Sequence, residues 1–420
     1  MNKAVQEYID RHQEEMIAFL KELIESPSSD GKPTKAQEVV KEKLEKLGFE
    51  TEAFVMDERV KDCADYCEPD ITYGPGTYNL MGLRKSDKPG KSLMLFGHID
   101  TEAEDYFGNF EDPYKAEEKD GKIYGLGAAD DKGGIAMMLE ALEAALNIEK
   151  YLPYDLRVLS ILGKHGGAFG TLSAMMKGYS GDCSLYIHPA ETGHGFKEIK
   201  NISLGLLDMD LTVYGEPGIP HDDLSKGVNS NLVMAEAVRI LETYNQKKRE
   251  ECIFDFGSFK GQPSFILNIG NISSQGDYGT ICEKTVCKIR CRFFRPLTTD
   301  SVFNEISSLL EEKLDGEWKL EKGRTRAEPA TVENEDPFVR FVEDSINEVE
   351  GNGEFIHQYH GGSDVRFPIL YGNSRCVGIG PYCELPIKGS GVREWIDIDN
   401  YLKGIAILTT ILLNYGKQEL

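Results

Sequence analysis

Short apolar runs of strand length, with helical segments between some of them, most narrowly limit how this chain can fold. The first 50 residues predict two helices, because apolar residues recur there at helical spacing, and Gly48 stands where a helix commonly ends. Runs that predict strands follow at residues 78–83, 92–96, 156–162 and 184–187. Strands that alternate with helices favour an α/β fold built on a central sheet.

The pattern changes near residue 201. Strands are predicted at residues 204–214, 265–272 and 286–294, and helices at residues 231–244 and 301–314. This order of elements is typical of a small α+β domain inserted into a larger one. The final residues return to the first pattern, with helices predicted at 337–349 and 401–415 and a strand at 376–379. We therefore predict an α/β domain of residues 1–200 and 325–420, interrupted by residues 201–324 with four strands and two helices.

Composition and charge argue against several classes of partner. The 420 residues suffice for two domains, and 40% of them are apolar, so a sizeable core can be buried. The net charge of −24 argues against nucleic acid or an anionic membrane surface, since both require a basic face. The N-terminal residues lack the apolar stretch of a signal peptide, and no run is long enough to span a bilayer. With nine cysteines and no export signal, we expect reduced thiols and a cytoplasmic protein.

A histidine and an aspartate follow the strand predicted at residues 92–96, in the sequence Gly97-His98-Ile99-Asp100. Residues two apart in an extended segment point the same way. Here they point into the crevice at the carboxyl ends of the strands, where open α/β sheets bind ligands. Taken alone, a surface histidine would explain this pair equally well.

The glycine-rich segment 124–134 adds two adjacent acids, Asp130 and Asp131, directly before a predicted helix. Such acids can be ordinary helix N-caps. Glycine, however, lets the backbone approach a bound ion closely, and a buried carboxylate needs a cationic partner. Together with His98 and Asp100, this segment predicts a metal site.

Both segments resemble the two most specific motifs of the M20 family of metallopeptidases and deacylases. That family includes carboxypeptidase G2, acetylornithine deacetylase, succinyl-diaminopimelate desuccinylase and aminoacylase-1. The resemblance extends from the N-terminal helices to Gly361-Gly362-Ser363-Asp364 near the end. It implies a zinc-exopeptidase-like catalytic domain, and it implies that the inserted domain is the family's ferredoxin-like lid and dimerisation domain.

In such enzymes two zinc ions share a bridging aspartate and a water molecule. By resemblance, His98 would bind one zinc ion, Asp130 would bridge, and Asp100 would orient His98. The family takes its remaining ligands from a Glu-Glu pair, from the glutamate of a Glu-Pro-Thr segment and from a C-terminal histidine.

This sequence departs from the family at the Glu-Glu pair, where Lys164 and His165 stand instead. The first glutamate of that pair is the family's general base, so Lys164 occupies the catalytic position. His165 occupies a ligand position, and histidine is a competent zinc ligand.

The other two ligand positions also differ. A His-Pro-Ala-Glu-Thr segment stands in place of Glu-Pro-Thr, so either His188 or Glu191 can supply the third ligand. Residues 389–390 are Gly-Ser where the C-terminal histidine is expected, so that ligand is absent. His357 and His360, which flank the Gly-Gly-Ser-Asp turn, can approach the cleft.

Residues of the inserted domain resemble the family's substrate-binding residues. His221, with Asn229 shortly after it, resembles the lid histidine that reaches across a dimer to stabilise the oxyanion. Arg292 resembles the lid arginine that grips a substrate carboxylate in bidentate fashion, and Arg295 is a close alternative. The resemblance therefore implies a homodimer and a small carboxylate-bearing substrate or ligand.

Three functions follow from these observations. The first is a metal-dependent hydrolase of an amide bond in a small N-acyl amino acid or peptide, without the usual general-base glutamate. The second is a catalytically silent protein that binds a carboxylate ligand or a partner. The third is an enzyme of another reaction class that uses Lys164 as a base or as an electrostatic group.

Charge accounting limits the metal content that we expect. Replacing two glutamates by Lys164 and His165 makes the site more positive by about three charges. Two like unit charges 4 Å apart repel by about 4 kcal/mol at an effective dielectric constant of about 20. We therefore expect at most one zinc or other divalent ion per chain, with the Lys164 ammonium near Asp130 in place of the second.

Overall fold

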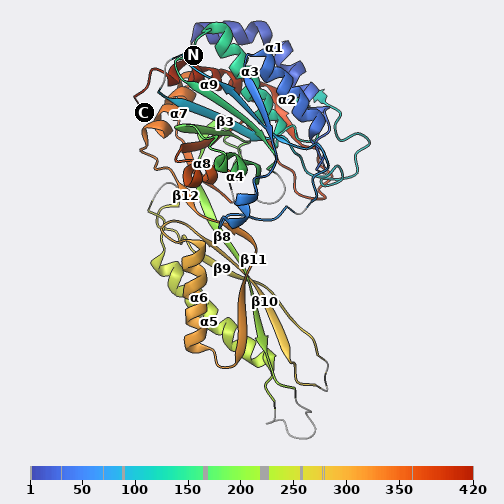
Figure 1. The fold of residues 1–420 in the computed structure, drawn as a ribbon, viewed down its shortest axis with the longest axis vertical. Helices are drawn as coiled ribbons and strands as arrows, with labels where there is room; N and C mark the ends of the chain where they lie inside the picture. The colour runs from blue at the N-terminus through green and yellow to red at the C-terminus, as the bar shows by residue number, and fades with distance from the viewer. Residues whose placement is uncertain are drawn as a thin grey trace.

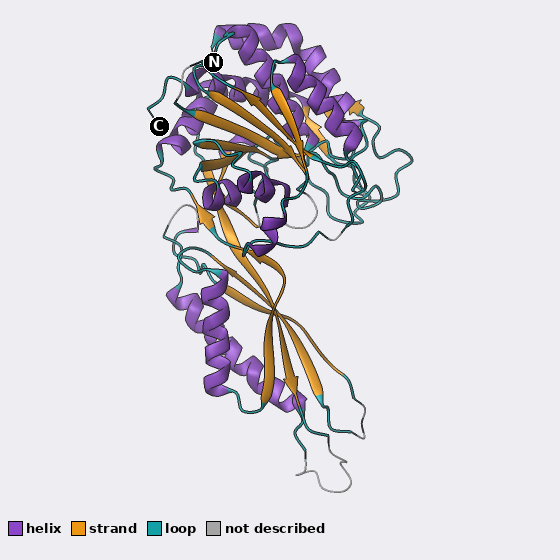
Figure 2. Cartoon of the chain, viewed as in Figure 1, coloured by secondary structure: helices purple, strands orange, loops and turns teal. Residues whose placement is uncertain are grey.

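The computed structural model describes residues 2–29, 31–69, 71–87, 90–163, 169–217, 227–255, 259–276, 278, 280–361 and 363–419. The molecule is elongated. An α/β part that contains both termini lies at one end, and a narrower α+β part extends from it (Figures 1 and 2).

A mixed sheet forms the centre of the α/β part. Its strands lie in the order β1 (Glu50–Phe54), β2 (Asn79–Arg84), β6 (Asp155–Ile161), β3 (Ser92–His98), β7 (Cys183–Ile187), β14 (Arg375–Ile379) and β8 (Glu198–Tyr214). Strand β3 is parallel to both β6 and β7, so the carboxyl ends of all three lie at one edge. All residues of β3 are buried, as expected for a parallel strand covered on both faces.

Helices cover both faces of this sheet. Alternate side chains of β3 point to opposite faces, and they show which helices cover each face. Leu93 and Leu95 enter a core shared with α1 (Lys3–Ile24), α2 (Thr34–Lys46), α3 (Lys132–Ile148), α7 (Pro337–Glu350) and α9 (Ile398–Tyr415). Met94 and Phe96 enter a second core with α4 (Phe169–Met176) and α8 (Arg366–Tyr371). Each buried side chain of this size contributes about 1.5–3 kcal/mol relative to exposure.

Strand β8 connects the two parts of the molecule, because it runs from one sheet region into the other (Figure 1). Near its start β8 pairs with β13 (Ile356–Gly361) along residues 198–204 and, at Lys200, with β14. In the same stretch β12 (Ala330–Thr331) pairs with Ile202 and Ser203. Beyond them β8 pairs with β10 (Lys284–Phe293) and β11 (Glu317–Ala327). The predicted boundaries after residues 200 and 324 therefore fall inside β8 and β11, and the division into these domains stays a prediction.

The α+β part has a core of its own. Strands β11, β8 and β10 are followed by β9 (Ile266–Ser274) at the edge, and α5 (Ser230–Glu251) and α6 (Thr299–Lys313) pack against them. Alternate residues of β8 enter this core: Leu207, Met209, Leu211 and Val213.

A small second sheet places the C-terminal segment beside the first half of the chain. Its strands lie in the order β15 (Cys383–Glu384), β16 (Trp395–Asp397), β5 (Lys122–Tyr124) and β4 (Glu117–Lys119). Pairing of β16 with β5 brings residue 394 next to the glycine-rich segment. In the described part of the chain, every helix is too short or too polar to cross a membrane.

Candidate metal centre

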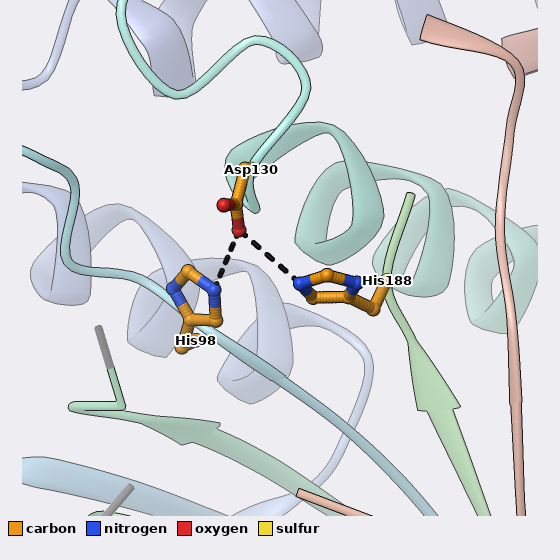
Figure 3. A group of neighbouring side chains, drawn as sticks. All are labelled: His98, Asp130 and His188. Atoms are coloured by element: carbon orange, nitrogen blue, oxygen red, sulfur yellow. Dashed lines mark ion pairs between the residues drawn. The ribbon is translucent and has the colours of Figure 1, made fainter. Parts of the chain in front are cut away.

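Three side chains from separate elements meet at the carboxyl edge of the sheet (Figure 3). His98 ends β3, His188 directly follows the neighbouring β7, and Asp130 lies in the turn before α3. Nε2 of His98 lies 2.7 Å from Oδ1 of Asp130, and Nε2 of His188 lies 3.4 Å from the same oxygen. Both histidines are buried, and the potential ligand atoms of the three residues lie within 4.8 Å of one another.

The electrostatics of His98 are dominated by its acidic neighbours. Burial by itself lowers the pKa of His98, but the carboxylates of Asp130, Asp131 and Asp100 together outweigh it and raise that pKa to about 10. Burial also raises the pKa of Asp131 well above its usual value. Asp131 holds the position of an N-cap, yet its carboxylate makes no cap to the helix and instead accepts a hydrogen bond from the backbone N–H of His98 at 3.2 Å.

The glycines of the two motifs make room for that carboxylate. A Cβ atom added at Gly97 would lie 2.6 Å from Oδ2 of Asp131, and one added at Gly134 would also collide with this side chain. Neither glycine has a positive φ. Their role here is therefore to admit the Asp131 carboxylate, whereas the close approach to a bound ion that the sequence suggested stays a prediction.

Glu394 fixes the turn that carries Asp130. Its carboxylate accepts hydrogen bonds from the backbone N–H groups of Gly127 at 2.6 Å and of Asp130 at 3.2 Å. Lys132, the first residue of α3, donates to the carbonyl oxygens of Ile24 and Ser26 and ties the turn to the end of α1. Burial lowers the pKa of Lys132 to about 7.

Asp100 contacts His98 mainly through its backbone. Its carbonyl oxygen lies 3.0 Å from Nδ1 of His98, whereas its carboxylate lies 3.7 Å from that atom. The carboxylate accepts hydrogen bonds from the hydroxyl of Tyr73 at 2.9 Å and the backbone N–H of Gly163 at 2.8 Å. Held at Nδ1, the ring of His98 directs Nε2 toward Asp130.

A buried lysine borders His188. Nζ of Lys200 lies 3.3 Å from Nδ1 of His188 and donates to the carbonyl oxygens of His188 and Pro189. The carboxylate of Glu198 lies 3.8 Å from this ammonium. On one face the ring of His188 stacks on Tyr186, with centroids 4.9 Å apart.

The remaining predicted ligands and catalytic residues are placed elsewhere or are not described. Glu191 is exposed, and its backbone N–H donates to Glu198 at 3.1 Å. Lys164, His165 and His221 lie outside the described residues, so their proposed roles stay predictions.

The predicted substrate-binding residues lie in the α+β part. Asn229 is the N-cap of α5, and its side chain accepts a hydrogen bond from the backbone N–H of Asn231 at 3.0 Å. Arg292 is exposed on β10, between Leu206 of β8 and Ile266 of β9. Substrate binding by Asn229 and Arg292 stays a prediction.

His357 and His360 were expected near the cleft. Nε2 of His357 lies 2.8 Å from Oε1 of Glu343 on α7, so this histidine belongs to a contact between β13 and α7. The side chain of His360 lies outside the described residues.

Sequence reasoning missed three residues that surround the group: Tyr73, Lys200 and Glu394. Lys200 precedes the predicted strand at residues 204–214, in a polar stretch whose sequence resembles a loop. Tyr73 and Glu394 reach the site through loop and strand pairings that local periodicity does not reveal.

The donor set fits the metal that the sequence predicts. Two imidazole nitrogens and one carboxylate are a combination found in catalytic zinc sites. The donors are buried, come from rigid strand ends and a fixed turn, and lie within 4.8 Å of one another. The residues present therefore suit one zinc or similar divalent ion.

Relatives of known activity share parts of this chain. Over 188 residues it is 29% identical to N-formyl-4-amino-5-aminomethyl-2-methylpyrimidine deformylase of Bacillus subtilis, a match that covers 43% of this chain and 40% of that protein. Over 243 residues it is 26% identical to an acetylornithine deacetylase of Buchnera aphidicola, covering 57% and 58%. The matched region thus spans between 40% and 58% of the length of these two relatives.

The similarity in fold and the match to a family profile cover more of the chain than these two relatives do. The structure is similar to that of aminopeptidase PepT from Bacillus cereus, with a TM-score of 0.71 and 18% identity over 97% of this chain and 99% of that chain. The predicted fold class, an α/β catalytic domain with an inserted α+β domain, is confirmed by such neighbours. The family profile matches residues 94–414, from β3 to α9. The predicted resemblance is thereby confirmed: this chain belongs to peptidase family M20/M25/M40.

Proposed function

We propose that this protein is a metal-dependent hydrolase that cleaves an amide bond in a small N-acyl amino acid or peptide. The observation that carries the proposal is the group formed by the buried His98 and His188 with the partly buried Asp130. The names of two relatives, a deformylase and an acetylornithine deacetylase, support the class of bond. A divalent cation held by the three side chains would supply a Lewis acid and a water molecule of lowered pKa.

The chain's own residues orient the group. Glu394 binds the backbone of Gly127 and Asp130, so the Asp130 carboxylate stays directed at both histidines. The carbonyl of Asp100 holds Nδ1 of His98 and leaves Nε2 for the ligand. Such outer contacts keep ligands in place and reduce the reorganisation that binding requires.

The residue that moves the proton differs from the family pattern. Lys164 stands at the position of the general base, and a lysine with its ordinary pKa of about 10.4 is a poor proton acceptor at neutral pH. General acid–base catalysis contributes about a hundred- to ten-thousand-fold to rate. We therefore propose slow turnover, with at most one divalent ion per chain.

Metal analysis of the purified protein together with a panel of N-acyl amino acids and dipeptides tests this function. We expect one divalent ion or fewer per chain, and turnover that is lost on chelation and returns with zinc. Asp130→Asn should remove both metal and turnover, whereas the matched control Asp120→Asn in the β4–β5 turn should keep both. Turnover that survives complete chelation would refute the metal-dependent mechanism, and two ions per chain would refute the metal count.

A binding protein without turnover is the second candidate. It is favoured by Lys164 at the base position and by the buried ammonium of Lys200 beside His188, since both make the site less like that of a hydrolase. Stoichiometric metal binding with no turnover across the panel would select this candidate.

We also infer a homodimer formed through the α+β part. Strand β9 is an edge strand, and its Ile266 and Ile272 are exposed. An edge strand with apolar side chains is a surface for pairing with another chain. In addition, the role expected for His221 requires a second copy. Sedimentation velocity at micromolar concentration should give a dimer, and a monomer would contradict both inferences.

A further inference from the structure

A pocket of about 390 Å³ is lined in part by Tyr73, which contacts Asp100 beside the candidate metal centre. The segment between β1 and β2 forms one wall, and Leu162 and Phe169, beyond the carboxyl end of β6, belong to the other. Its volume is in the range of small-molecule sites, about 300–1,000 Å³. Tyr73 connects it to the metal centre, because it lines the pocket and its hydroxyl donates to the Asp100 carboxylate beside His98.

The lining of this pocket is largely aromatic and apolar. Tyr73 and Phe169 meet edge to face, with ring centroids 5.2 Å apart and an interplanar angle of 67°. Tyr66, Ile71, Tyr78 and Leu162 add further apolar surface. The charged side chains on its border, Lys61 and Glu68, are exposed. Such a surface suits a flat, uncharged group rather than an ionic one.

A buried network holds the wall in place. Asp65, next to the pocket residue Tyr66, is fully buried and accepts hydrogen bonds from Nε of Arg366 at 3.1 Å and from the hydroxyl of Tyr371 at 2.8 Å. It also accepts from the backbone N–H of Glu328 at 2.6 Å. A wall fixed before binding loses less conformational entropy when a ligand enters.

The same wall is attached to β11. Arg326 donates to the carbonyl oxygen of Tyr66 at 3.1 Å, and Arg324 donates to that of Glu68 at 2.9 Å. The pocket therefore keeps its shape through contacts with the strand that leads back from the α+β part, as well as through the α/β core.

We propose that this pocket is a specificity site for an uncharged aromatic group of the ligand. In the proposed reaction, on which this assignment of the group rests, it would receive the acyl side of an N-aroyl amino acid. The amide then lies toward His98, and the carboxylate is left for the cationic residues expected in the α+β part, such as Arg292.

Binding of two ketones that cannot be hydrolysed tests the pocket separately from the reaction. Benzoylpropionate and levulinate are the analogues of N-benzoylglycine and N-acetylglycine with CH₂ in place of the amide NH, and they differ only in phenyl against methyl. Isothermal titration of the protein as purified should give a dissociation constant at least about tenfold lower for benzoylpropionate. Equal affinity for the two compounds would overturn the proposal.

A variant that fills the pocket locates the binding. Ile71→Trp should weaken benzoylpropionate at least about tenfold and leave levulinate nearly unchanged, because only the phenyl group needs the space. The matched control is Leu232→Trp, at an exposed position of α5. Should circular dichroism show that Ile71→Trp is unfolded, Met56→Trp fills the same pocket from another side.

The outcomes separate the pocket from the proposed function. Phenyl-dependent binding that Ile71→Trp removes supports the pocket, even if no amide on the panel is hydrolysed. Turnover of N-acyl amino acids without preference for an aroyl group, together with phenyl binding that Ile71→Trp leaves intact, would overturn the pocket while the hydrolase stands.

Discussion

The ammonium nitrogen of Lys200 lies 3.3 Å from Nδ1 of His188, whose other ring nitrogen faces Asp130. Lys200 is buried, and the Glu198 carboxylate 3.8 Å away also accepts hydrogen bonds from backbone N–H groups of the loop that follows His188. That carboxylate therefore offsets only part of the charge. A positive charge thus borders the group that is expected to hold a divalent cation.

Replacing Lys200 with methionine should strengthen zinc binding. Two unit charges 4 Å apart repel by about 4 kcal/mol at an effective dielectric constant of about 20, so even a fraction of this repulsion is measurable. We expect the zinc dissociation constant of Lys200→Met to fall at least about tenfold, as measured by competition with a chromophoric chelator.

Lys197→Met is the matched control, because Lys197 lies just before β8 and its ammonium bonds to Asn347 and Gly351, on α7 and at its C-cap. Its zinc affinity should equal that of the unmodified protein. If zinc bound more weakly to Lys200→Met than to this control, Lys200 would be a residue that supports the site by holding the His188 loop.

Glu394→Gln should weaken the metal site from outside the ligand set. The carboxylate accepts two backbone N–H groups of the turn, and an amide would place its own NH₂ against one of them. Loss of such an outer contact commonly costs about 10- to 100-fold in metal affinity. The same chelator competition measures the zinc affinity of Glu394→Gln, and Glu384→Gln in β15 is the control. An unchanged affinity of Glu394→Gln would show that the turn is held without the Glu394 carboxylate.

Asp65→Ala should destabilise the fold. Its partner Arg366 is fully buried and would lose the carboxylate that accepts from its Nε atom. Removing one member of a buried ion pair commonly costs about 3–5 kcal/mol, because the other charge stays buried without compensation. Urea unfolding should show this loss, whereas the control Asp62→Asn, exposed in the same segment, should leave the midpoint in place.

The elements that carry their own apolar pattern could be predicted from the sequence. Strand β3 was recognised from residues 92–96 and α9 from residues 401–415, because burial on a sheet or helix face imposes a period that a local window contains. The start of β8 was placed too late, at residue 204. Its first residues include Glu198, Lys200 and Asn201, which are polar yet buried and hydrogen-bonded, so the sequence pattern resembles a loop.

The candidate site was predictable only where a motif holds its residues close together in the chain. His98 and Asp130 belong to such motifs. His188 was one of two sequence candidates for the third ligand, and parallel pairing of β3 with β7 places it beside His98. Lys200 and Glu394 arrive through the pairings of β8 with β14 and of β16 with β5, which join segments far apart in sequence. No local pattern encodes such pairings.

His357 should make the protein less stable in mild acid. Its Nε2 lies 2.8 Å from Oε1 of Glu343, but in the described part of the chain neither atom has a hydrogen bond of acceptable geometry. Burial therefore prevails over the carboxylate and lowers the pKa of His357. In the unfolded chain a histidine takes up its proton near about pH 6.5.

The sign of the effect follows from this difference. As the pH falls through about 6.5, the unfolded state binds a proton that the folded state still rejects, so the free energy of unfolding decreases by up to about 1.4 kcal/mol per pH unit. His357→Gln removes this pH-dependent contribution to the free energy of unfolding. The stability of the unmodified protein relative to His357→Gln, measured by urea unfolding between about pH 7.5 and 5, should therefore decrease as the pH is lowered. A relative stability that rises toward acid would mean that Glu343 stabilises the charged imidazolium, and that the pKa of His357 is raised.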